Sequence, residues 1–185
     1  MKITKTEFPG LLIVEPHVYG DERGYFFESF RSETFHHAGI NLNFIQDNQS
    51  KSKRGVLRGL HYQLKFGQGK LVRCTLGEVF DVAVDIRKGS PTFGKSFSMM
   101  LNDQDHFEIY IPPGFAHGFC VVSDEAIFQY KCTEIYHPED EYGIRWNDKS
   151  FEIKWPILSP TLSKRDKLFP LLSDQNESLL PDFTL

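Results

Sequence analysis

Short runs of apolar residues, each bounded by turn-forming residues, recur about every ten positions along the chain, a spacing typical of an antiparallel β-sandwich or barrel. The clearest strand spans residues 77–87, where apolar and polar positions alternate. Because side chains on a strand point alternately to its two faces, Asp81 and Asp85 share one face. The other face carries Phe80, Val82, Val84 and Ile86.

Further segments show strand-like patterns, at residues 11–15, 25–30, 44–48, 70–76, 108–111, 118–122, 127–133 and 152–155. A short helix is predicted over residues 32–38, with Ser32 as its N-cap and Gly39 as its stop, and a second short helix is predicted to begin at Ser163. No repeat, linker or alternation of strands with helices occurs. We therefore predict one all-β domain over residues 1–185, with a loosely held tail over 173–185.

Composition narrows the class of protein. The 185 residues are 40% hydrophobic and carry a net charge of −4, which argues against a general nucleic-acid binder. The three cysteines lie in apolar runs without a metal-binding spacing, which indicates free thiols in a reducing compartment. The N-terminus lacks a signal-peptide pattern, and no apolar stretch approaches the roughly 18 residues of a membrane span. We expect a cytoplasmic protein that does not bind membranes.

One segment of this acidic chain is locally cationic. Residues 51–73 hold seven lysines and arginines, no aspartate or glutamate, and His61 near their middle. A phosphate or diphosphate would suit such a cluster, since arginine can chelate it in bidentate fashion; a solvated basic face is the alternative. In a regular strand, Arg58 would point away from the face shared by Gly59 and His61, and Gly59 would let a ligand approach the backbone closely.

Two other windows carry candidate side chains. His117 follows a Pro-Pro-Gly turn at the start of a strand, where it is either structural or catalytic. In the strand over 127–133, Phe128, Tyr130 and Cys132 share one face, which we expect to point inward. Tyr130 is then either a core residue with one hydrogen bond or a functional group.

A metal site is not expected. His61 is followed by Tyr62 and Gln63 instead of a second histidine, and only His117 could join it. Two histidines without a nearby carboxylate fall short of the three protein ligands of a catalytic zinc or iron centre. Adjacent residues do not share a helix face, so His36 and His37 are interpreted as surface residues.

Several motifs, taken together and in order, resemble one enzyme family. They are the segments at 21–28, 46–48, 55–63, 68–73, 111–119 and 130–133. At this spacing they are similar to dTDP-4-dehydrorhamnose 3,5-epimerases, from about residue 3 to about residue 170. The resemblance implies a cupin-type double-stranded β-helix, or jelly-roll barrel, that acts as a homodimer without a cofactor. The implied substrate is dTDP-4-keto-6-deoxyglucose, inverted at C3 and C5 on the way to dTDP-L-rhamnose.

The resemblance also implies residue roles. His61 corresponds to the base, Tyr130 to the acid on the opposite face of the sugar, and Lys70 to the cation at the ketone oxygen. Asp166 corresponds to the carboxylate that orients His61, with Asp81 as the alternative from the strand pattern. The implied substrate and nucleotide contacts are Arg23, Phe26, Glu28, Gln46, Asp47, Asn48, Arg58, His117, Tyr136, Glu141 and Arg165. Among these, Tyr136 matches the aromatic that stacks on thymine, and part of the set is expected from the neighbouring subunit.

The chain departs from the family pattern in three places, one of which is the tail from Ser173, which has no clear counterpart. It also leaves other functions open. Arg165 stands where the family usually has lysine, and Phe66 and Gly67 stand where a proline is expected nearby. One alternative inverts only C3 or acts on another nucleotide-linked 4-keto sugar. Others are a metal-dependent enzyme of the same fold and a non-catalytic sugar-nucleotide binder, which would be expected to lack the base or the acid.

Overall fold

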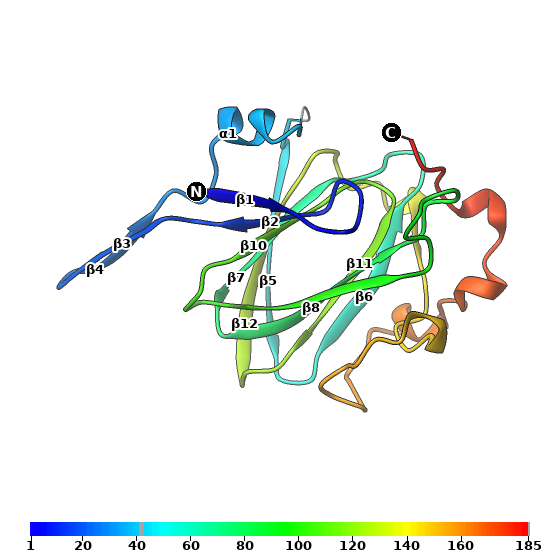
Figure 1. Ribbon diagram of the computed structural model, residues 1–185. Coiled ribbons are helices and arrows are strands. Elements are labelled where there is room, and N and C mark those ends of the chain that lie inside the picture. Colours follow the sequence, from blue (N-terminus) through cyan, green and yellow to red (C-terminus); the bar gives the residue numbers. More distant parts are fainter. Residues whose placement is uncertain (41–42, 185) are drawn as a thin grey trace.

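Two antiparallel sheets face each other in the computed structural model, which describes residues 1–40 and 43–184 (Figure 1). The first sheet has the strand order β1-β2-β10-β7-β12-β5. Its strands are β1 (Lys2–Lys5), β2 (Leu12–Glu15), β10 (Glu108–Ile111), β7 (Lys70–Leu76), β12 (Glu125–Cys132) and β5 (Gln46–Lys53). The second has the order β13-β6-β11-β8-β9. Its strands are β13 (Glu141–Gly143), β6 (Leu57–Gln63), β11 (Phe115–Val121), β8 (Glu78–Asp85) and β9 (Ser96–Asn102). The all-β prediction is confirmed.

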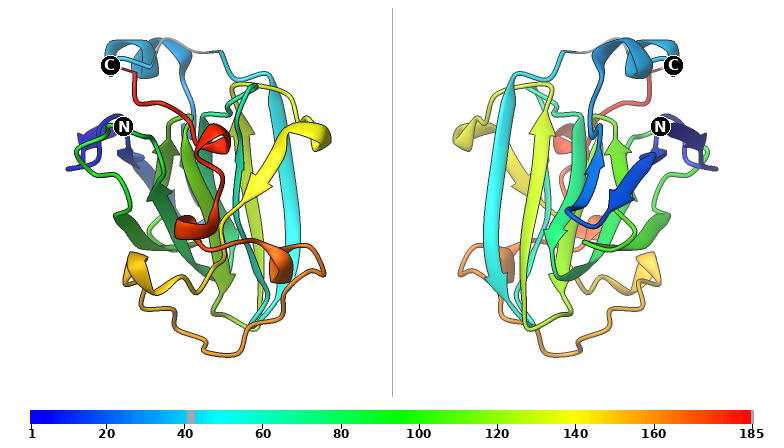
Figure 2. Two further views of the ribbon diagram at one scale, coloured as in Figure 1. Left: turned by 90° about the vertical axis from the view of Figure 1, so that its right-hand side faces the viewer. Right: turned by 90° about the vertical axis from the view of Figure 1, so that its left-hand side faces the viewer.

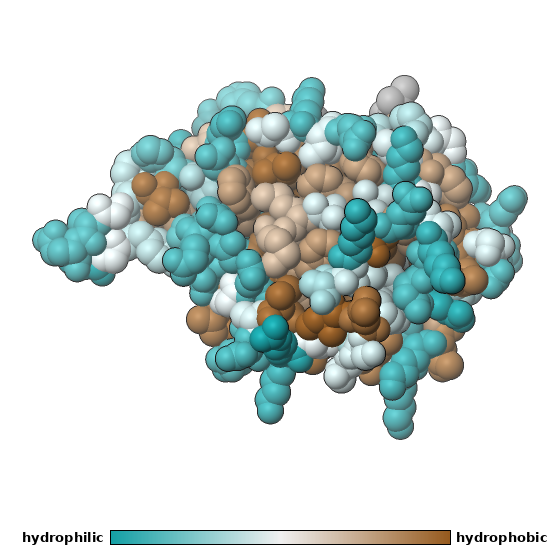
Figure 3. All heavy atoms as spheres, turned by 60° about the horizontal axis from the view of Figure 1, so that its bottom comes forward, coloured by the Kyte–Doolittle hydropathy of each residue, from teal (hydrophilic) through white to brown (hydrophobic). Residues whose placement is uncertain are grey.

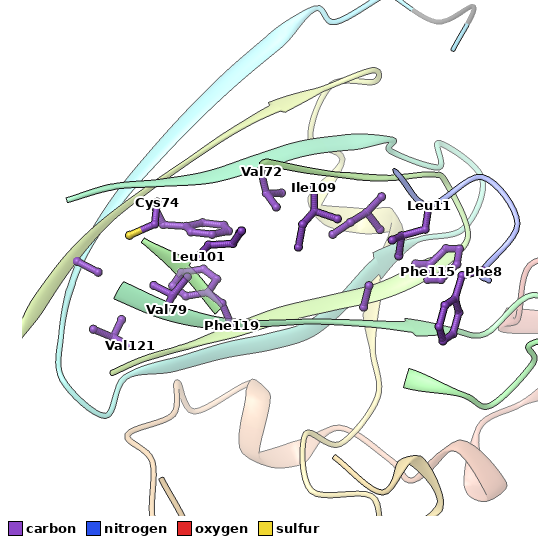
Figure 4. Packing of buried hydrophobic residues seen from close by; sticks show 14 residues of the cluster. Phe8, Leu11, Val72, Cys74, Val79, Leu101, Ile109, Phe115, Phe119 and Val121 are labelled. Carbon is purple, nitrogen blue, oxygen red and sulfur yellow. The ribbon is translucent and has the colours of Figure 1, made fainter. Parts of the chain in front are cut away.

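The main core fills the space between the two sheets. Val72 and Ile109 reach it from the six-stranded sheet, and Val79, Leu101 and Phe119 reach it from the five-stranded sheet (Figure 4). Each of these side chains is at most 5% exposed. Alternation along the strands produces this core, because every second residue of each strand points inward.

Part of the outer face of each sheet is covered by chain from outside the barrel. Helix α1 (Ser32–His37) places Phe35 against Leu71 and Tyr110 on the six-stranded sheet. The C-terminal segments cross the five-stranded sheet, as the orange and red ribbon of Figure 2 shows. Their helical elements, within the described residues, are the 3-10 turns Lys149–Phe151, Asp166–Leu168, Leu172–Asp174 and Glu177–Leu179; a further 3-10 turn, Pro138–Asp140, precedes β13.

Strand β8 has the predicted alternation, but the strand pattern alone does not tell which of its two faces points into the barrel. Val82 and Val84 face the C-terminal segments, so the apolar face points out of the barrel. Asp81 and Asp85 therefore lie inside it, both fully buried. Asp85 is satisfied by a bidentate contact from Arg87 and by two hydroxyl groups. Buried carboxylates require such partners, because their desolvation is costly.

The predicted strand at 152–155 is wrong. Those residues follow the Lys149–Phe151 turn in irregular structure, and the Trp155 indole donates a hydrogen bond to the Trp146 carbonyl. Phe151 and Trp155 still pack on the five-stranded sheet. The apolar residues of this segment are therefore buried, as their pattern suggested, but without the backbone hydrogen bonds of a strand.

The C-terminal tail, predicted to be loosely held, makes several contacts with the barrel. Leu180 is 6% exposed, and the Phe183 N–H donates to the Lys88 carbonyl at 2.9 Å. The Arg87 guanidinium lies between the rings of Phe115 and Phe183, at 4.4 and 4.9 Å from their centroids. Polar composition suggested a free tail, but a few apolar anchors hold it; Leu185 is outside the described residues.

A two-stranded hairpin, β3 (Val18–Asp21) and β4 (Gly24–Phe27), projects from the body of the molecule (Figures 1 and 3). Figure 3 shows a hydrophilic tip. Its aromatic residues are unusually open to solvent, with Tyr19, Tyr25 and Phe26 at 62%, 59% and 70% exposure. No helix among the described residues is long and apolar enough to cross a membrane.

Candidate active site

A cavity of about 790 Å³ opens between the two sheets and collects most of the predicted site. Predicted site residues that line it are Gln46, Asn48, Arg58, His61, Lys70, His117, Tyr130, Tyr136, Glu141, Arg165 and Asp166. Most come from strands of the two sheets, Asp166 comes from the 3-10 turn at Asp166–Leu168, and Tyr136 and Arg165 come from loops. Residues more than 100 positions apart are thus brought into one polar site.

His61 and Asp166 form a directly bonded pair at this site. The imidazole Nε2 is 3.0 Å from the Asp166 Oδ1. Burial raises the pKa of Asp166, but hydrogen bonds from His61, Ser163 and the Gly59 N–H outweigh it, so the pKa is lowered overall. The carboxylate therefore stays charged next to the imidazole. With Nε2 bonded to Asp166, Nδ1 is the imidazole nitrogen that remains for a substrate.

The predicted orientation of Arg58 is wrong, because strand β6 contains a β-bulge. His61 pairs with His117, whereas Arg58 pairs with Phe119, so strand β6 has one more residue than β11 between the two pairs. This extra residue turns Arg58 to the cavity on the same side as His61. Gly59 lies at the bulge with φ +133°, and a Cβ there would come within 2.6 Å of the Gly118 Cα. Only glycine fits this close approach of two backbones.

His117 belongs to a second histidine–aspartate pair. Its Nε2 is 2.9 Å from the Asp81 Oδ2, and both residues are buried. Asp81, the alternative orienting group for His61, is therefore bonded to His117 instead. The other oxygen of Asp81 has no hydrogen-bond partner in the described structure.

Lys70 and Tyr130 face the cavity from the six-stranded sheet. Burial lowers the pKa of Lys70, opposed by the fields of Cys132, Glu141 and Asp81, and no hydrogen bond from the described residues contributes. Burial raises the pKa of Tyr130 to about 12, so its phenol keeps its proton at neutral pH. The inward face predicted for Phe128, Tyr130 and Cys132 is confirmed, since Phe128 and Cys132 are buried and Tyr130 lines the cavity.

Charged groups gather at Glu141. Its Oε2 accepts hydrogen bonds from the Tyr136 hydroxyl, at 2.6 Å, and from Arg165. Its Oε1 lies 3.9 Å from the His61 Nδ1. Arg58, unlike Arg165, donates both of its hydrogen bonds to a neutral group, the hydroxyl of Ser52. The charge of the Arg58 guanidinium therefore remains available for an anion.

Four predicted contacts lie outside the cavity of this chain. Arg23 and Phe26 are on the projecting hairpin, and Glu28 follows it, paired with Arg31. Asp47 points to the opposite side of strand β5 from Asn48 and pairs with Lys131 at 2.9 Å. The structure therefore does not join these four residues to the others within one chain.

Sequence reasoning missed part of the cavity wall. Ser50 lines it, and its buried hydroxyl has no partner in the described structure. Ser52 lies two residues further along the strand and holds Arg58. Both continue the face of Gln46 and Asn48, so the period of two would have identified them. Ser163, also missed, accepts a hydrogen bond from the Asp166 N–H and fixes the 3-10 turn.

The cavity does not contain a cluster suited to a metal. No group of three or more histidine, cysteine, aspartate or glutamate side chains within residues 1–40 and 43–184 could hold an ion. The donors present are paired among themselves, as the two histidine–aspartate pairs illustrate.

Comparison with known proteins identifies the family. The family model described as dTDP-4-dehydrorhamnose 3,5-epimerase matches residues 5–174. The enzyme of that name from Shigella flexneri is 58% identical over 168 residues, covering 90% of this chain and 93% of the relative. A crystal structure of dTDP-6-deoxy-D-glucose-3,5-epimerase from Legionella pneumophila, in complex with dTDP-4-keto-L-rhamnose, is 48% identical with a TM-score of 0.96. The alignment covers 100% of this chain and 99% of the Legionella chain.

A relative with narrower activity has the same fold. ChmJ, a 3'-monoepimerase from Streptomyces bikiniensis solved in complex with dTDP-quinovose, is 34% identical with a TM-score of 0.90. The alignment covers 96% of this chain and 91% of that one. The cupin-type architecture implied by the motifs is confirmed by these structures. This chain belongs to the dTDP-4-dehydrorhamnose 3,5-epimerase family.

Proposed function

We propose that the protein inverts C3 and C5 of dTDP-4-keto-6-deoxyglucose, giving dTDP-4-keto-L-rhamnose for dTDP-L-rhamnose biosynthesis. The observation that carries the proposal is the placement of a histidine–aspartate pair, an ammonium group and a phenol in one cavity. The complex of the Legionella relative with dTDP-4-keto-L-rhamnose supports the substrate class.

His61 is proposed as the base. C3 and C5 both flank the C4 ketone, so loss of a proton from either carbon gives an enolate with its charge on the same oxygen. The Nδ1 lone pair would take this proton, and the adjacent Asp166 carboxylate would stabilise the imidazolium that results. A neutral imidazole is suited to this role near pH 7.

Lys70 is proposed to stabilise the enolate oxygen. Its ammonium comes from strand β7 on the sheet opposite His61, and no hydrogen bond from the described residues competes for it. A charge placed where negative charge develops lowers the barrier more than it strengthens ground-state binding. One such cation can serve both inversions, because both enolates share the C4 oxygen.

Tyr130 is proposed as the acid. Inversion requires a proton to return to the face opposite the base, and Tyr130 lies on β12 in the sheet that faces His61. The raised pKa of its phenol keeps it protonated until the enolate forms. These groups supply the proton transfers and the charge, so we propose that no metal or other cofactor takes part.

Recognition of the nucleotide is proposed for the remaining polar residues. Arg58, which has no carboxylate partner among the described residues, would bind the diphosphate through its guanidinium. Gln46, Asn48 and Tyr136 would surround the base and ribose, with Tyr136 stacking on thymine, and His117 would contact the sugar. Arg23, Phe26, Glu28 and Asp47 would contribute from outside the cavity of their own chain.

Deuterium exchange tests this assignment. The protein is incubated with dTDP-4-keto-6-deoxyglucose in heavy water, and NMR follows deuterium and configuration at C3 and C5. His61→Asn should abolish both exchange and turnover, a loss beyond the roughly 10²–10⁴-fold of a single proton-transfer contribution. Tyr130→Phe should still exchange deuterium into C3 and C5 with the original configuration retained, while formation of the inverted product falls steeply. Inversion by Tyr130→Phe at the wild-type rate would exclude the phenol as the acid.

The second candidate is inversion of C3 alone, or action on another nucleotide-linked 4-keto sugar. The similarity to the 3'-monoepimerase ChmJ favours considering it. The same experiment separates the two, because a monoepimerase would leave C5 in its original configuration after C3 has inverted.

We further propose a cytoplasmic homodimer with a composite nucleotide site. The exposed aromatic residues of the projecting hairpin support it, since Phe26 at 70% exposure is better suited to contact than to solvent. The three buried, unpaired cysteines support a reducing compartment.

A further inference from the structure

Glu141 lies between the proposed base and a cation. Its Oε1 is 3.9 Å from the His61 Nδ1, the nitrogen not used by Asp166. Its Oε2 is bonded to Arg165 and to the Tyr136 hydroxyl. Glu141 is only 11% exposed, so solvent screens this arrangement weakly. His61 thus has a carboxylate beside each of its ring nitrogens.

Two carboxylates around one imidazole create a conflict for a base. Asp166 accepts a hydrogen from Nε2, which leaves a lone pair on Nδ1 facing the Glu141 charge. An uncompensated carboxylate at this distance favours the imidazolium form. An imidazolium has no lone pair and cannot remove a proton from carbon. The Glu141 charge must therefore be compensated if His61 is to act as a base near neutral pH.

We propose that Arg165 acts through Glu141 as a positioning residue, compensating its charge so that His61 stays neutral and able to accept a proton. Tyr136 shares the same carboxylate oxygen but is neutral, so it orients Glu141 without cancelling its charge. The proposal rests on the proposed function, since it concerns the base of that reaction. It assigns Arg165 an effect on the chemical step in addition to any contact with the nucleotide.

Other charged and titratable groups share the cavity with His61. They are Arg58, Lys70, His117, Tyr130 and Tyr136. The positive charges of Lys70 and Arg58 also disfavour protonation of the His61 imidazole. His117 is bonded to its own aspartate, Asp81. None of these groups is changed in the variants below, so their effects on the His61 titration are the same in wild type and variants.

The test is a double-mutant cycle with Arg165→Gln, Glu141→Gln and the double variant, read first by NMR titration of the His61 imidazole in the ligand-free protein. Arg165→Gln should move this titration to higher pH by about 0.5 pH unit, less than the roughly 0.8 that a charge at the Glu141 distance gives in bulk water, because Arg165 lies beyond Glu141. The double variant should return to within about 0.3 pH unit of wild type, because the charge that Arg165 compensates is gone. Arg165→Lys keeps the cation and should stay near wild type.

The pH dependence of kcat supplies the second measurement. Its acid limb should move to higher pH in Arg165→Gln and back in the double variant, so activity lost at pH 7 is regained in alkaline buffer. If Arg165 only binds phosphate, KM rises and neither the titration nor the acid limb moves, which overturns the proposal. A titration shift that persists in the double variant also overturns it. If wild type turns over no 4-keto sugar while the titration cycle holds, the proposed function fails and the Arg165–Glu141–His61 coupling stands.

Discussion

At the scale of residues, the site contains two histidine–aspartate pairs that face each other across neighbouring strands. His61 and His117 are register partners, and each is bonded through Nε2 to an aspartate. Their environments differ: the His61 side chain is 22% exposed in the cavity, and that of His117 is 7% exposed. Both carboxylate oxygens of Asp166 have a hydrogen-bond donor, His61 at Oδ1 and the Gly59 N–H at Oδ2, whereas one oxygen of Asp81 has none in the described structure. These differences favour His61 as the reacting group.

We predict different kinetic effects for substitution of the two aspartates. Asp166→Asn should lower kcat by about 10²–10⁴-fold, because an amide removes the charge that stabilises the imidazolium and can hold the ring in the wrong tautomer. Asp81→Asn should change kcat by less than about tenfold and act mainly on KM, since it leaves the His61 pair intact. Steady-state kinetics of both variants, with unfolding curves to verify the fold, make the comparison. Equal losses of kcat would show that the two pairs act as one unit.

At the scale of elements, irregularities position the site. The bulge in β6 turns Arg58 and His61 into one cavity, and the 3-10 turn at Asp166–Leu168 carries the carboxylate back to β6. The C-terminal segment then covers the outer face of the same sheet, with Leu180 in its apolar cluster. A short element at the end of the chain thus supports the strand that holds the proposed base.

The anchoring of the tail leads to a stability prediction. Phe183→Ala should lower the free energy of unfolding by about 1–2 kcal/mol, because it removes a partly buried ring and one of the two aromatic faces around Arg87. The epimerase activity should be unchanged, since Arg87, Lys88 and Phe115 do not line the cavity. Denaturant unfolding measures the effect, with Leu158→Ala, at 88% exposure, as the matched control. Equal stability of the two variants would mean that the tail contacts contribute nothing.

At the scale of the whole molecule, one chain has most but not all of the predicted nucleotide contacts. The cavity provides the proposed catalytic groups, while Arg23 and Phe26 project on the hairpin. A symmetric dimer would reconcile these facts, because each hairpin could complete the cavity of the other subunit.

Subunit complementation tests the composite site. His61→Asn and a double variant, Arg23→Ala with Phe26→Ala, should each have little activity alone. When the two are unfolded together and refolded, about a quarter of the wild-type activity should return, since half of randomly mixed dimers are hybrids and one site in each hybrid is intact. Mixing His61→Asn with Tyr130→Phe is the control, because both changes lie in the cavity of one chain and the hybrid has no intact site. Failure of the first mixture to regain activity, with dimers present by sedimentation, would exclude a hairpin shared in this way.

Local patterns in the sequence were enough to predict the class of fold and most of the residues that line the cavity. Alternation along segments such as 77–87 decides which side chains share a face, and ordered motifs such as the one around His61 indicate the family. Both are local properties of the chain, so they can be read without coordinates. The tertiary structure decided which of two aspartates meets His61, because that contact joins residues 105 positions apart. It also turned Arg58 inward through a bulge, buried Asp81, anchored the tail and placed Glu141 between His61 and Arg165. Each of these depends on how distant segments pack, which no periodicity within a single segment records.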